Sequence, residues 1–319
     1  MDIVRAVIFL LCGMVILWKC AEFLVAGAVG LAKRLGVSSL VIGLTVVAMG
    51  TSAPEAAASI AAVLRQAGGG DIAVGNVFGS NIANLALVGG LVALIRPLKV
   101  KKQTLCREIP VMFGVALLLW PVLHNLYLSR PEGLVLLAVF SLLVILMVYA
   151  AKRDAQNQQR DTTSGIGNTR RNVLFVVIGL IGLALGAKIA VEAAVFIGGR
   201  IGLSEAVIGL TIIALGTSLP ELATCVVAAI KGHHDISVGN LVGSNIFNTL
   251  LVTGGAGTVR PFEVGQRFAG GVDYWIMIIV SAAFAVAILI GRRVIGRAGG
   301  AMLLCGYIGY VVYLLAYSD

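Results

Sequence analysis

Hydrophobic residues along this chain form ten long segments, which are separated by short polar connections. Each segment approaches or exceeds the roughly 20 residues that an α-helix needs to cross the hydrocarbon core of a bilayer. The pattern therefore predicts an all-α polytopic membrane protein with ten transmembrane helices. The expected helices cover residues 3–28, 38–64, 72–95, 108–124, 131–151, 172–197, 204–230, 236–258, 272–291 and 298–317.

Two blocks of sequence occur twice, once in each half of the chain. Residues 40–55 read LVIGLTVVAMGTSAPE and residues 206–221 read AVIGLTIIALGTSLPE, with 11 of 16 positions identical. A second block begins at Asp71 and again at Asp235, with 13 of its first 20 positions identical. Because each half has an odd number of expected helices, the two copies must lie in opposite orientations, as in many secondary transporters. The sequence predicts a 5+5 inverted repeat with a first repeat at 1–151, a linker at 152–171 and a second repeat at 172–319.

Composition and charge support a membrane protein and indicate its orientation. Hydrophobic residues make up 59% of the chain and charged residues only 12%, whereas about a quarter of a soluble domain is charged. The net charge of +9 does not indicate nucleic-acid binding, because no aromatic residues interleave with the basic clusters. If the N-terminus lies outside, 16 of the 24 Lys and Arg residues fall in inside connections and six in outside ones. This bias predicts a multi-pass plasma-membrane protein with both termini outside and the 152–171 linker in the cytoplasm.

A proline interrupts the second expected helix of each half. Pro54 and Pro220 have no backbone N–H, so the carbonyls of Gly50 and Gly216 lose their helical donors. We expect a kink or a short unwound stretch that exposes backbone oxygens. Irregular backbone at membrane depth is tolerated only where it is buried or lines a wet cavity, and interrupted segments at matching places in two repeats indicate a binding site.

Polar residues are spaced so that they share one face of each interrupted helix and of the helix that follows it. Four positions in each interrupted helix recur at i, i+3, i+4 and i+7, and two positions in each following helix recur at i and i+4. Ionisable groups at membrane depth indicate an ion pathway. The first-half positions are Ala48, Thr51, Ser52, Glu55, Ser80 and Asn84, and the second-half positions are Ala214, Thr217, Ser218, Glu221, Ser244 and Asn248.

The chemistry of these groups favours a hard cation. They supply carboxylate, hydroxyl, amide and carbonyl oxygens but no thiolate or imidazole, which argues against zinc or copper. Calcium accepts six to eight oxygen ligands in adaptable geometry, whereas magnesium demands a tighter octahedron and retains its water. Two ionised glutamates carry a charge of −2, which one Ca²⁺, two Na⁺ or two protons would neutralise. Competition between such ions for one site is the physical basis of exchange.

The paired motifs G-T-S-x-P-E and G-N-x-x-G-S-N-I-x-N resemble the α-repeats of the cation/Ca²⁺ exchanger superfamily, to which the sodium/calcium exchangers belong. The resemblance covers the whole chain, including a short central loop like that of prokaryotic members. It implies alternating access around a cation site formed by the second, third, seventh and eighth helices. It also implies which groups bind the ions: the carbonyls of Ala48 and Ala214, and the side chains of Thr51, Ser52, Glu55, Ser80, Asn84, Thr217, Ser218, Glu221, Ser244 and Asn248.

The chain departs from the family pattern at one position that matters for coupling. Asn248 stands where some members carry Asp, so this site has one acidic group fewer. The expected function is an antiporter that exchanges Ca²⁺ for Na⁺, with a Ca²⁺/H⁺ exchanger and a passive cation channel as the alternatives. We expect no enzymatic activity, because no His or Lys base lies at mid-span beside the hydroxyl residues. We expect no cofactor beyond the transported ions, and a monomer or a weak homo-oligomer in the lipid bilayer.

Other polar residues within or near the apolar segments have less specific interpretations. Lys19–Glu22 and Lys188–Glu192 have the spacing of ion pairs within a helix, although a gating role in the first and sixth helices stays open. Asp71, Asp235 and Asp273 lie near the ends of spans, where solvated or capping roles are expected. His233 and His234 are either solvated loop residues or a metal or proton site. The repeated pairs Gly75–Gly79 and Gly239–Gly243 predict close approach between helices.

Overall fold

Apolar helices make up nearly all of the described chain. The computed structural model describes residues 2–65, 69–158, 168–203, 208, 212 and 214–316. The expected all-α class holds apart from four strands of two residues each, which lie in connections between helices. In the first half the elements are α1 (Ile3–Leu35), α2 (Ser39–Ile42), η1 (Gly43–Val47), α3 (Ala48–Thr51), α4 (Ala53–Arg65), α5 (Gly69–Ile82), η2 (Ala83–Val88), α6 (Gly89–Ile95), β1 (Leu98–Lys99), η3 (Thr104–Glu108), α7 (Ile109–Leu123), β2 (Tyr127–Leu128) and α8 (Arg130–Gln158).

The second half has a similar order of elements after the linker, but among the described residues no counterpart of η3 precedes α15, and most of the segment equivalent to α2 and η1 lies outside them. Its elements are α9 (Thr169–Arg200), α11 (Ala214–Thr217), α12 (Leu219–Ile230), α13 (His234–Phe247), η5 (Asn248–Val252), α14 (Thr253–Val259), β3 (Phe262–Glu263), α15 (Val272–Ile290), β4 (Val294–Ile295) and α16 (Arg297–Ala316). The helices extend into the expected linker from both sides, because α8 continues to Gln158 and α9 begins at Thr169. Asn168 caps α9 by accepting hydrogen bonds from the backbone N–H groups of Arg170 and Arg171.

Seven helical stretches among the described residues are long and apolar enough to cross a membrane, and a bent pair makes an eighth if it counts as one span. The expected count of ten therefore stays a prediction. Of the two other expected spans, 204–230 lies partly outside the described residues, and its described part contains the shorter apolar helix α12. The segment 236–258 is helical throughout, but its asparagines, serines and glycines lower its hydropathy. The seven stretches are Ile3–Leu35, Gly69–Ile95, Thr104–Leu123, Arg130–Ala150, Thr169–Arg200, Val272–Ile290 and Arg297–Ala316, and the bent pair is Ser39–Thr51 with Ala53–Arg65.

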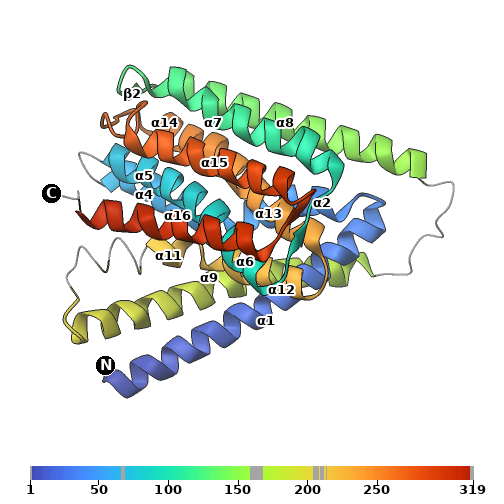
Figure 1. The fold of residues 1–319 in the computed structure, drawn as a ribbon, viewed down its shortest axis with the longest axis horizontal. Coiled ribbons are helices and arrows are strands. Elements are labelled where there is room, and N and C mark those ends of the chain that lie inside the picture. Colours follow the sequence, from blue (N-terminus) through green and yellow to red (C-terminus); the bar gives the residue numbers. More distant parts are fainter. Residues whose placement is uncertain are drawn as a thin grey trace.

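The long helices surround a core of shorter, interrupted ones (Figure 1). The long helices α1 and α9 pack against each other along one side of the bundle, and α7 and α8 lie on the opposite side. The run from α5 through η2 to α6 is mostly buried, whereas α1, α8 and α16 are mostly exposed at the periphery. Both chain ends lie at the same end of the bundle, and α8 ends at the other. The polar repeated segments therefore lie inside a shell of apolar helices.

The proline in each half produces a kink, as the sequence predicts. The axis bends by 42° between Ser39–Thr51 and Ala53–Arg65. At the bend Ser52 leaves the helical region, with φ −87° and ψ 5°, and Ser218 has nearly the same angles, φ −88° and ψ 5°. The chain re-enters a helix at the next residue in both halves. The interruption is therefore a one-residue kink and not a longer unwound stretch.

The hydrogen bonds between the short strands follow a two-fold pattern: each strand pair has an equivalent pair in which the two halves have changed places. Strand β1, which follows α6, pairs antiparallel with β4, and the equivalent pair is β3, which follows α14, with β2. The adjoining bonds match as well: the N–H of Val100 donates to the carbonyl of Arg293 at 2.8 Å, and that of Val264 donates to Leu126 at 2.8 Å. Leu126 and Arg293 both have left-handed backbones, with φ 62° and 70°. Each pair joins one half of the chain to the other.

Close packing of the repeated glycines differs between the halves. A Cβ on Gly239 would lie 2.8 Å from the carbonyl oxygen of Leu40, and one on Gly243 would lie 2.5 Å from that of Leu44. Helix α13 thus packs directly on the backbone of α2 and η1, as the glycine spacing predicts. In the first half a Cβ on Gly79 would meet none of the described residues within 4 Å, and among them one on Gly75 would meet only the Phe268 ring. The prediction is therefore correct for Gly239–Gly243. For Gly75–Gly79 it stays untested, because most of the segment equivalent to α2 and η1 in the second half, residues 205–213, lies outside the described residues.

Candidate cation site

Two buried glutamates lie next to the two kinks, one from each half of the chain. Glu55 is in the first turn of α4 and Glu221 is in the first turn of α12, and both side chains are fully buried. The kinks at Ser52 and Ser218 redirect the chain three residues before each glutamate. The two carboxylates lie close enough for their charges to interact.

Hydrogen bonds connect the two kinked segments across the site. The hydroxyl of Ser52 donates to Oε1 of Glu221 at 3.0 Å. The adjacent hydroxyl of Thr51 donates to Oδ1 of Asn240, on α13, at 3.1 Å. Because the partners come from opposite halves of the chain, the site is assembled from both repeats.

Several polar atoms of this cluster are buried without a hydrogen-bond partner among the described residues. They include both carboxylate oxygens of Glu55, Oε2 of Glu221 and the amide atoms of Asn84 and Asn248. Buried polar atoms without partners are rare in folded proteins, because each costs on the order of 1–3 kcal/mol. An oxygen-coordinated cation would satisfy the carboxylate and carbonyl oxygens among these atoms. The arrangement is therefore suited to binding a hard cation.

Both asparagines are located at π-helical turns. Asn84 is the second residue of η2 and Asn248 is the first residue of η5, and both are fully buried. A π-helical turn adds one residue to a helix, which alters the direction of the side chains after it, and such turns occur frequently at functional sites. These turns occupy equivalent places in the two halves, so the amide groups are positioned by the same local geometry.

The structure buries most of the residues that the sequence predicts for the site. Thr51, Ser52, Ser80, Ser218 and Ser244 are all at most 3% exposed. The carbonyl oxygen of Ala48 is less available to an ion than expected, because it already accepts hydrogen bonds from the Ser52 N–H at 3.0 Å and the Thr51 hydroxyl at 3.4 Å. The surroundings of the Ala214 side chain lie outside the described residues. Thr217 is only partly buried, unlike its counterpart Thr51.

Two asparagines that are not among the predicted ligands support the walls of the site. Asn240 accepts the Thr51 hydroxyl and donates to the sulfur of Cys225 at 3.4 Å. Asn76, its counterpart, donates to the carbonyl of Glu55 at 3.1 Å and to the hydroxyl of Ser59 at 2.9 Å. Each lies four residues before the site serine of its helix, so the helical spacing alone could have identified them.

An open cavity of about 190 Å³ reaches the two kinks from α9. It is lined by Pro54, Gly216, Thr217 and Pro220 on the kinked side and by Lys188 and its neighbours on α9. The lining is mainly apolar, but Thr217 places a hydroxyl beside the second kink. The cavity therefore provides a path between the outer helices and the kinked segments.

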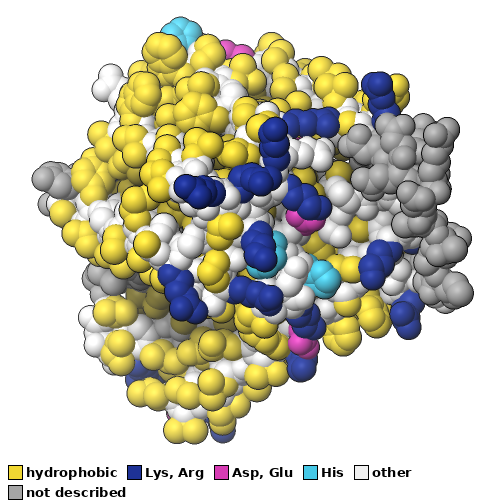
Figure 2. Space-filling view, turned by 45° about the vertical axis from the view of Figure 1, so that its right-hand side comes forward, with side chains coloured by type: hydrophobic (Ala, Val, Ile, Leu, Met, Phe, Trp, Pro, Cys, Tyr) yellow, Lys and Arg dark blue, Asp and Glu magenta, His cyan; other side chains and the backbone are white. Residues whose placement is uncertain are grey.

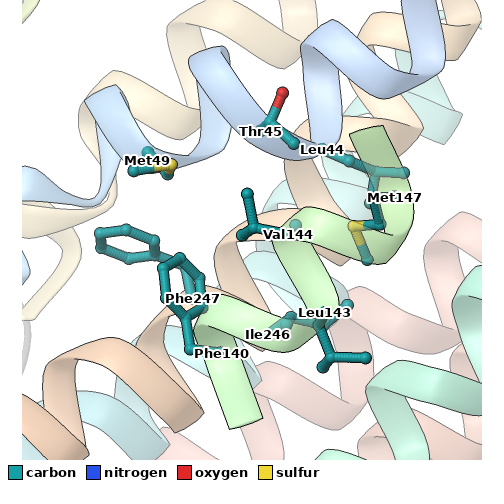
Figure 3. A pocket seen from close by; sticks show the side chains of 10 residues that line it. Leu44, Thr45, Met49, Phe140, Leu143, Val144, Met147, Ile246 and Phe247 are labelled. Carbon is teal, nitrogen blue, oxygen red and sulfur yellow. The ribbon is translucent and has the colours of Figure 1, made fainter. Parts of the chain in front are cut away.

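An apolar layer separates the cluster from α8 on another side (Figure 3). Met49 and Leu44, from the kinked segment, face Phe140 and Val144 of α8 and Phe247 of α13. The cavity between them is only about 10 Å³, roughly the space of one water molecule. The Thr45 hydroxyl beside it already donates to the carbonyl of Val41 at 2.6 Å. This layer has no group that would attract an ion.

Among the described residues, the charge of the site comes from two carboxylates. No group of three or more His, Cys, Asp and Glu residues that could hold a metal ion occurs in the described part of the chain. The other groups of the cluster are neutral amides and hydroxyls. Such a site offers oxygen donors with a total charge of at most −2, which suits an ion that must also be released.

Comparison with known proteins agrees with this arrangement. The family model described as sodium/calcium exchanger protein matches residues 5–149 and 171–316. Over 317 residues the chain is 37% identical to the inner membrane protein YrbG of Escherichia coli (strain K12), covering 97% of this chain and 96% of that one. Over 351 residues it is 35% identical to the sodium/calcium exchanger MaX1 of Methanosarcina acetivorans, covering 96% and 97%.

A solved structure has the same fold. The sodium-calcium exchanger NCX_Mj, soaked with zero Na⁺ and Ca²⁺, superposes with a TM-score of 0.82 at 29% identity, covering 98% of this chain and all of that one. Each matched segment of the family model contains one of the two kinks and one of the two fully buried glutamates, Glu55 and Glu221. The chain is therefore a member of the sodium/calcium exchanger protein family, whose members are membrane antiporters.

Proposed function

We propose that this protein exchanges Ca²⁺ for Na⁺ across the plasma membrane by alternating access to the cluster around Glu55 and Glu221. The observation that carries the proposal is the set of buried carboxylate oxygens without hydrogen-bond partners among the described residues, both on Glu55 and one on Glu221. Six to eight oxygens suit Ca²⁺, and the hydroxyl and amide groups around the glutamates can supply the remainder. One Ca²⁺ or two Na⁺ would balance the two negative charges.

Family membership supports the same proposal from a different direction. MaX1 is named as a sodium/calcium exchanger, and NCX_Mj is described as a sodium-calcium exchanger. We infer the same pair of ions here, ten helices in a 5+5 inverted repeat, and ligands from the twelve positions that the motifs indicate. The cavity at Pro54, Thr217 and Pro220 is the proposed route by which ions reach the site from one side.

The test is calcium uptake into sealed liposomes that contain sodium. Glu55→Gln and Glu221→Gln keep the side-chain shape but remove a charge. At an effective dielectric near 20, two unit charges about 4 Å apart interact by about 4 kcal/mol, so we expect either variant to abolish measurable uptake. Glu263→Gln is the matched control, because Glu263 is exposed on β3 and should keep parental uptake. Normal uptake by either site variant would refute the assignment.

A calcium/proton exchanger is the second candidate, and Asn248 is the observation that favours it. With amides at both Asn84 and Asn248 the site has two acidic groups, which two protons could neutralise as well as two Na⁺ could. Uptake driven by a sodium gradient at equal pH supports the first candidate, and uptake driven only by a pH gradient supports the second. A passive cation channel would transport calcium with no counter-ion on the far side.

A further inference from the structure

A basic pocket opens at the end of the bundle where β1 pairs with β4. Its volume is about 380 Å³, and its charged or titratable lining residues are Lys99, Lys101, His233, His234, Asp235 and Arg293. We call this site the basic pocket. In Figure 2 dark-blue and cyan side chains gather in the middle of one face of the molecule, with hydrophobic surface around them. The proposed transport mechanism makes no use of this pocket.

The pocket is built from both halves of the chain. Lys99 and Lys101 lie on β1 and just after it, and Arg293 directly precedes β4. His233 is at the N-cap position of α13 and His234 is the first residue of that helix. The hydrogen bond from the Val100 N–H to the Arg293 carbonyl holds the first two walls together. The histidine wall is joined by the ion pair between Lys101 Nζ and Asp235 Oδ2 at 2.6 Å. The positions of the charged groups are thus fixed by backbone pairing and an ion pair.

The positive charge of the pocket is only partly compensated. Asp235 pairs with Lys101, but neither Lys99 nor Arg293 makes an ion pair in the described part of the structure. Burial and the nearby cations Lys33 and Lys231 lower the pKa of His233, and burial and the cations Arg96 and Lys99 lower that of His234. The buried Nδ1 of His234 has no hydrogen-bond partner among the described residues. The pocket therefore has a positive field and a polar atom without a partner.

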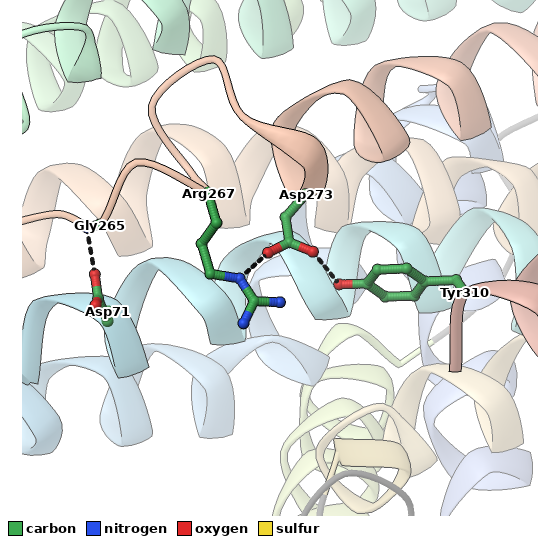
Figure 4. A network of polar contacts seen from close by, with 5 residues as sticks. All are labelled: Asp71, Gly265, Arg267, Asp273 and Tyr310. Atoms are coloured by element: carbon green, nitrogen blue, oxygen red, sulfur yellow. Dashed lines mark hydrogen bonds and ion pairs between the residues drawn. The ribbon is translucent and has the colours of Figure 1, made fainter. Parts of the chain in front are cut away.

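In the described part of the other half, the positions equivalent to Lys99, Lys101 and Arg293 carry no cation. In the two-fold relation of the halves, Glu263 occupies the position equivalent to Lys99, Gly265 that equivalent to Lys101, and Leu126 that equivalent to Arg293. Asp71, which corresponds to Asp235, accepts the backbone N–H of Gly265 at 2.6 Å (Figure 4).

The nearby charged groups at that end also bind one another. The buried Asp273 pairs with Arg267 and accepts the Tyr310 hydroxyl at 3.2 Å; a solvated role is thus wrong for Asp273. Duplication therefore does not explain the basic pocket, because among the described residues the cations Lys99, Lys101 and Arg293 have no cationic counterparts in the other pair of strands.

We propose that the basic pocket binds a phosphate-bearing anion, namely the phosphodiester headgroup of an anionic phospholipid in the adjacent leaflet. Lys and Arg side chains are the usual partners of phosphate, and basic pockets at the cytoplasmic ends of transmembrane helices bind lipid headgroups. The position of the pocket at the end of a membrane bundle favours a lipid over a free anion. The bound headgroup would connect β1, β4 and the α12–α13 turn, so it would stabilise the contact between the two halves.

A bias of basic residues toward one side of the membrane also places cations at this end. That bias predicts no preference for lining residues over other exposed cations nearby. Lys102 and Arg107 are exposed at the same end but do not line the pocket. They supply a control that removes the same charge from outside the site.

The experiment measures the thermal stability of the purified protein in detergent during titration with phosphatidylglycerol. Parallel titrations use phosphatidylcholine, inorganic phosphate and water-soluble glycerophosphoglycerol. The variants are Lys99→Gln with Arg293→Gln, and the control Lys102→Gln with Arg107→Gln. Without added lipid, both should unfold at the parental temperature and keep parental calcium uptake. A variant that unfolds early would be replaced by the single Lys99→Gln change.

We expect phosphatidylglycerol, and not phosphatidylcholine, to raise the unfolding temperature of the parent and the control. After loss of the two lining cations, about ten times more phosphatidylglycerol should be needed to raise the unfolding temperature by the same amount. If glycerophosphoglycerol or inorganic phosphate stabilises the parent at similar concentrations, the pocket binds phosphate but its ligand is a soluble anion and not a lipid. Equal responses of the pocket variant and the control, or no response of the parent to any phosphate compound, would overturn the proposal.

Discussion

Glu55 and Glu221 occupy equivalent positions in the two repeats, yet their surroundings are not equal. Oε1 of Glu221 accepts a hydrogen bond from Ser52, whereas both carboxylate oxygens of Glu55 lack a partner among the described residues. The hydroxyl of Ser218, the counterpart of Ser52, also lacks one. The site is therefore symmetric in sequence and asymmetric in its bonding. An ion would interact mainly with Glu55 and would share Glu221 with Ser52.

Asn248→Asp tests whether position 248 faces the ion. The change adds a third carboxylate beside two buried ones, and like charges at about 4 Å repel by about 4 kcal/mol at an effective dielectric of 20. Such a group retains its proton near neutral pH. We expect calcium uptake by the variant to fall as the pH decreases below neutrality, since the added proton competes with the ion.

The measurement is uptake in liposomes from about pH 6 to 9 at fixed sodium, alongside the parent. Asn84→Asp, the change at the matching position of the first half, should alter the profile in the same direction. Profiles that superimpose on that of the parent would show that neither amide lies next to the ion.

At the residue scale the sequence predicts which residues are buried at the candidate site but not the hydrogen bonds between them. The duplication and the helical spacing are sufficient to predict that Glu55, Glu221, Asn84 and Asn248 are buried together. The bond from Ser52 to Glu221 could not be predicted, because it joins residues 169 positions apart and depends on how the halves pack. The same holds for the ion pair of Lys231 with Glu22 at 3.1 Å, whereas the pair of Lys19 with Glu22 at 3.1 Å follows from helical spacing.

At the scale of elements, the kink was predictable and the π-helical turns were not. A proline removes a specific backbone donor, so its effect can be located from the sequence. A π-helical turn depends on packing around the inserted residue, and no residue type specifies it. Glycine spacing is partly predictive of structure. It permits close approach between helices, but the neighbour that makes the approach is known only from the fold.

Substitution of glycine by alanine distinguishes a glycine that packs on a neighbouring backbone from one that does not. Gly243→Ala places a methyl group 2.5 Å from the Leu44 carbonyl oxygen and 2.8 Å from the Ala48 side chain, and overpacking of this kind costs about 1–3 kcal/mol. The added methyl of Gly79→Ala meets none of the described residues within 4 Å, and alanine is favoured over glycine in a helix by up to about 1 kcal/mol. We therefore expect the first variant to unfold at a lower temperature than the parent and the second to unfold at the same or a higher temperature.

The measurement is thermal unfolding of the two purified variants in the same detergent. Each change adds one methyl group at the same position of the repeated motif, so the variants control for each other. Equal destabilisation of both would mean that helix packing around Gly79 is as tight as around Gly243.

At the scale of the whole molecule, two pairs of short strands connect the halves, and each pair takes one strand from each half. Strand pairs β1–β4 and β2–β3 each join the two halves, and the long helices α1 and α9 pack on each other. Two arginines reinforce the relation: Arg96 donates to the carbonyl of Ile230 at the end of α12, and Arg260 donates to that of Val63 near the end of α4 at 3.1 Å. Sequence predicts the repeats, but these contacts follow from their two-fold packing.

The orientation of the molecule in the membrane is tested by cysteine labelling. The excess of Lys and Arg in alternate connections predicts that Gln158 is cytoplasmic and that the connection before β2 is outside. Gln158→Cys and His124→Cys are made in a version that lacks the five native cysteines; His124 is exposed. In intact cells a membrane-impermeant thiol reagent should label His124→Cys and should label Gln158→Cys only after permeabilisation, because the bilayer excludes the reagent from the cytoplasm.

The labelling result also determines which leaflet is adjacent to the basic pocket. Figure 1 places both chain ends at one end of the bundle and the end of α8 at the other, so one correct assignment fixes the remainder. If Gln158→Cys is labelled in intact cells and His124→Cys is not, the molecule is inverted. The cations of the pocket would then face the outer leaflet, and the charge bias would have failed to predict the orientation of this chain.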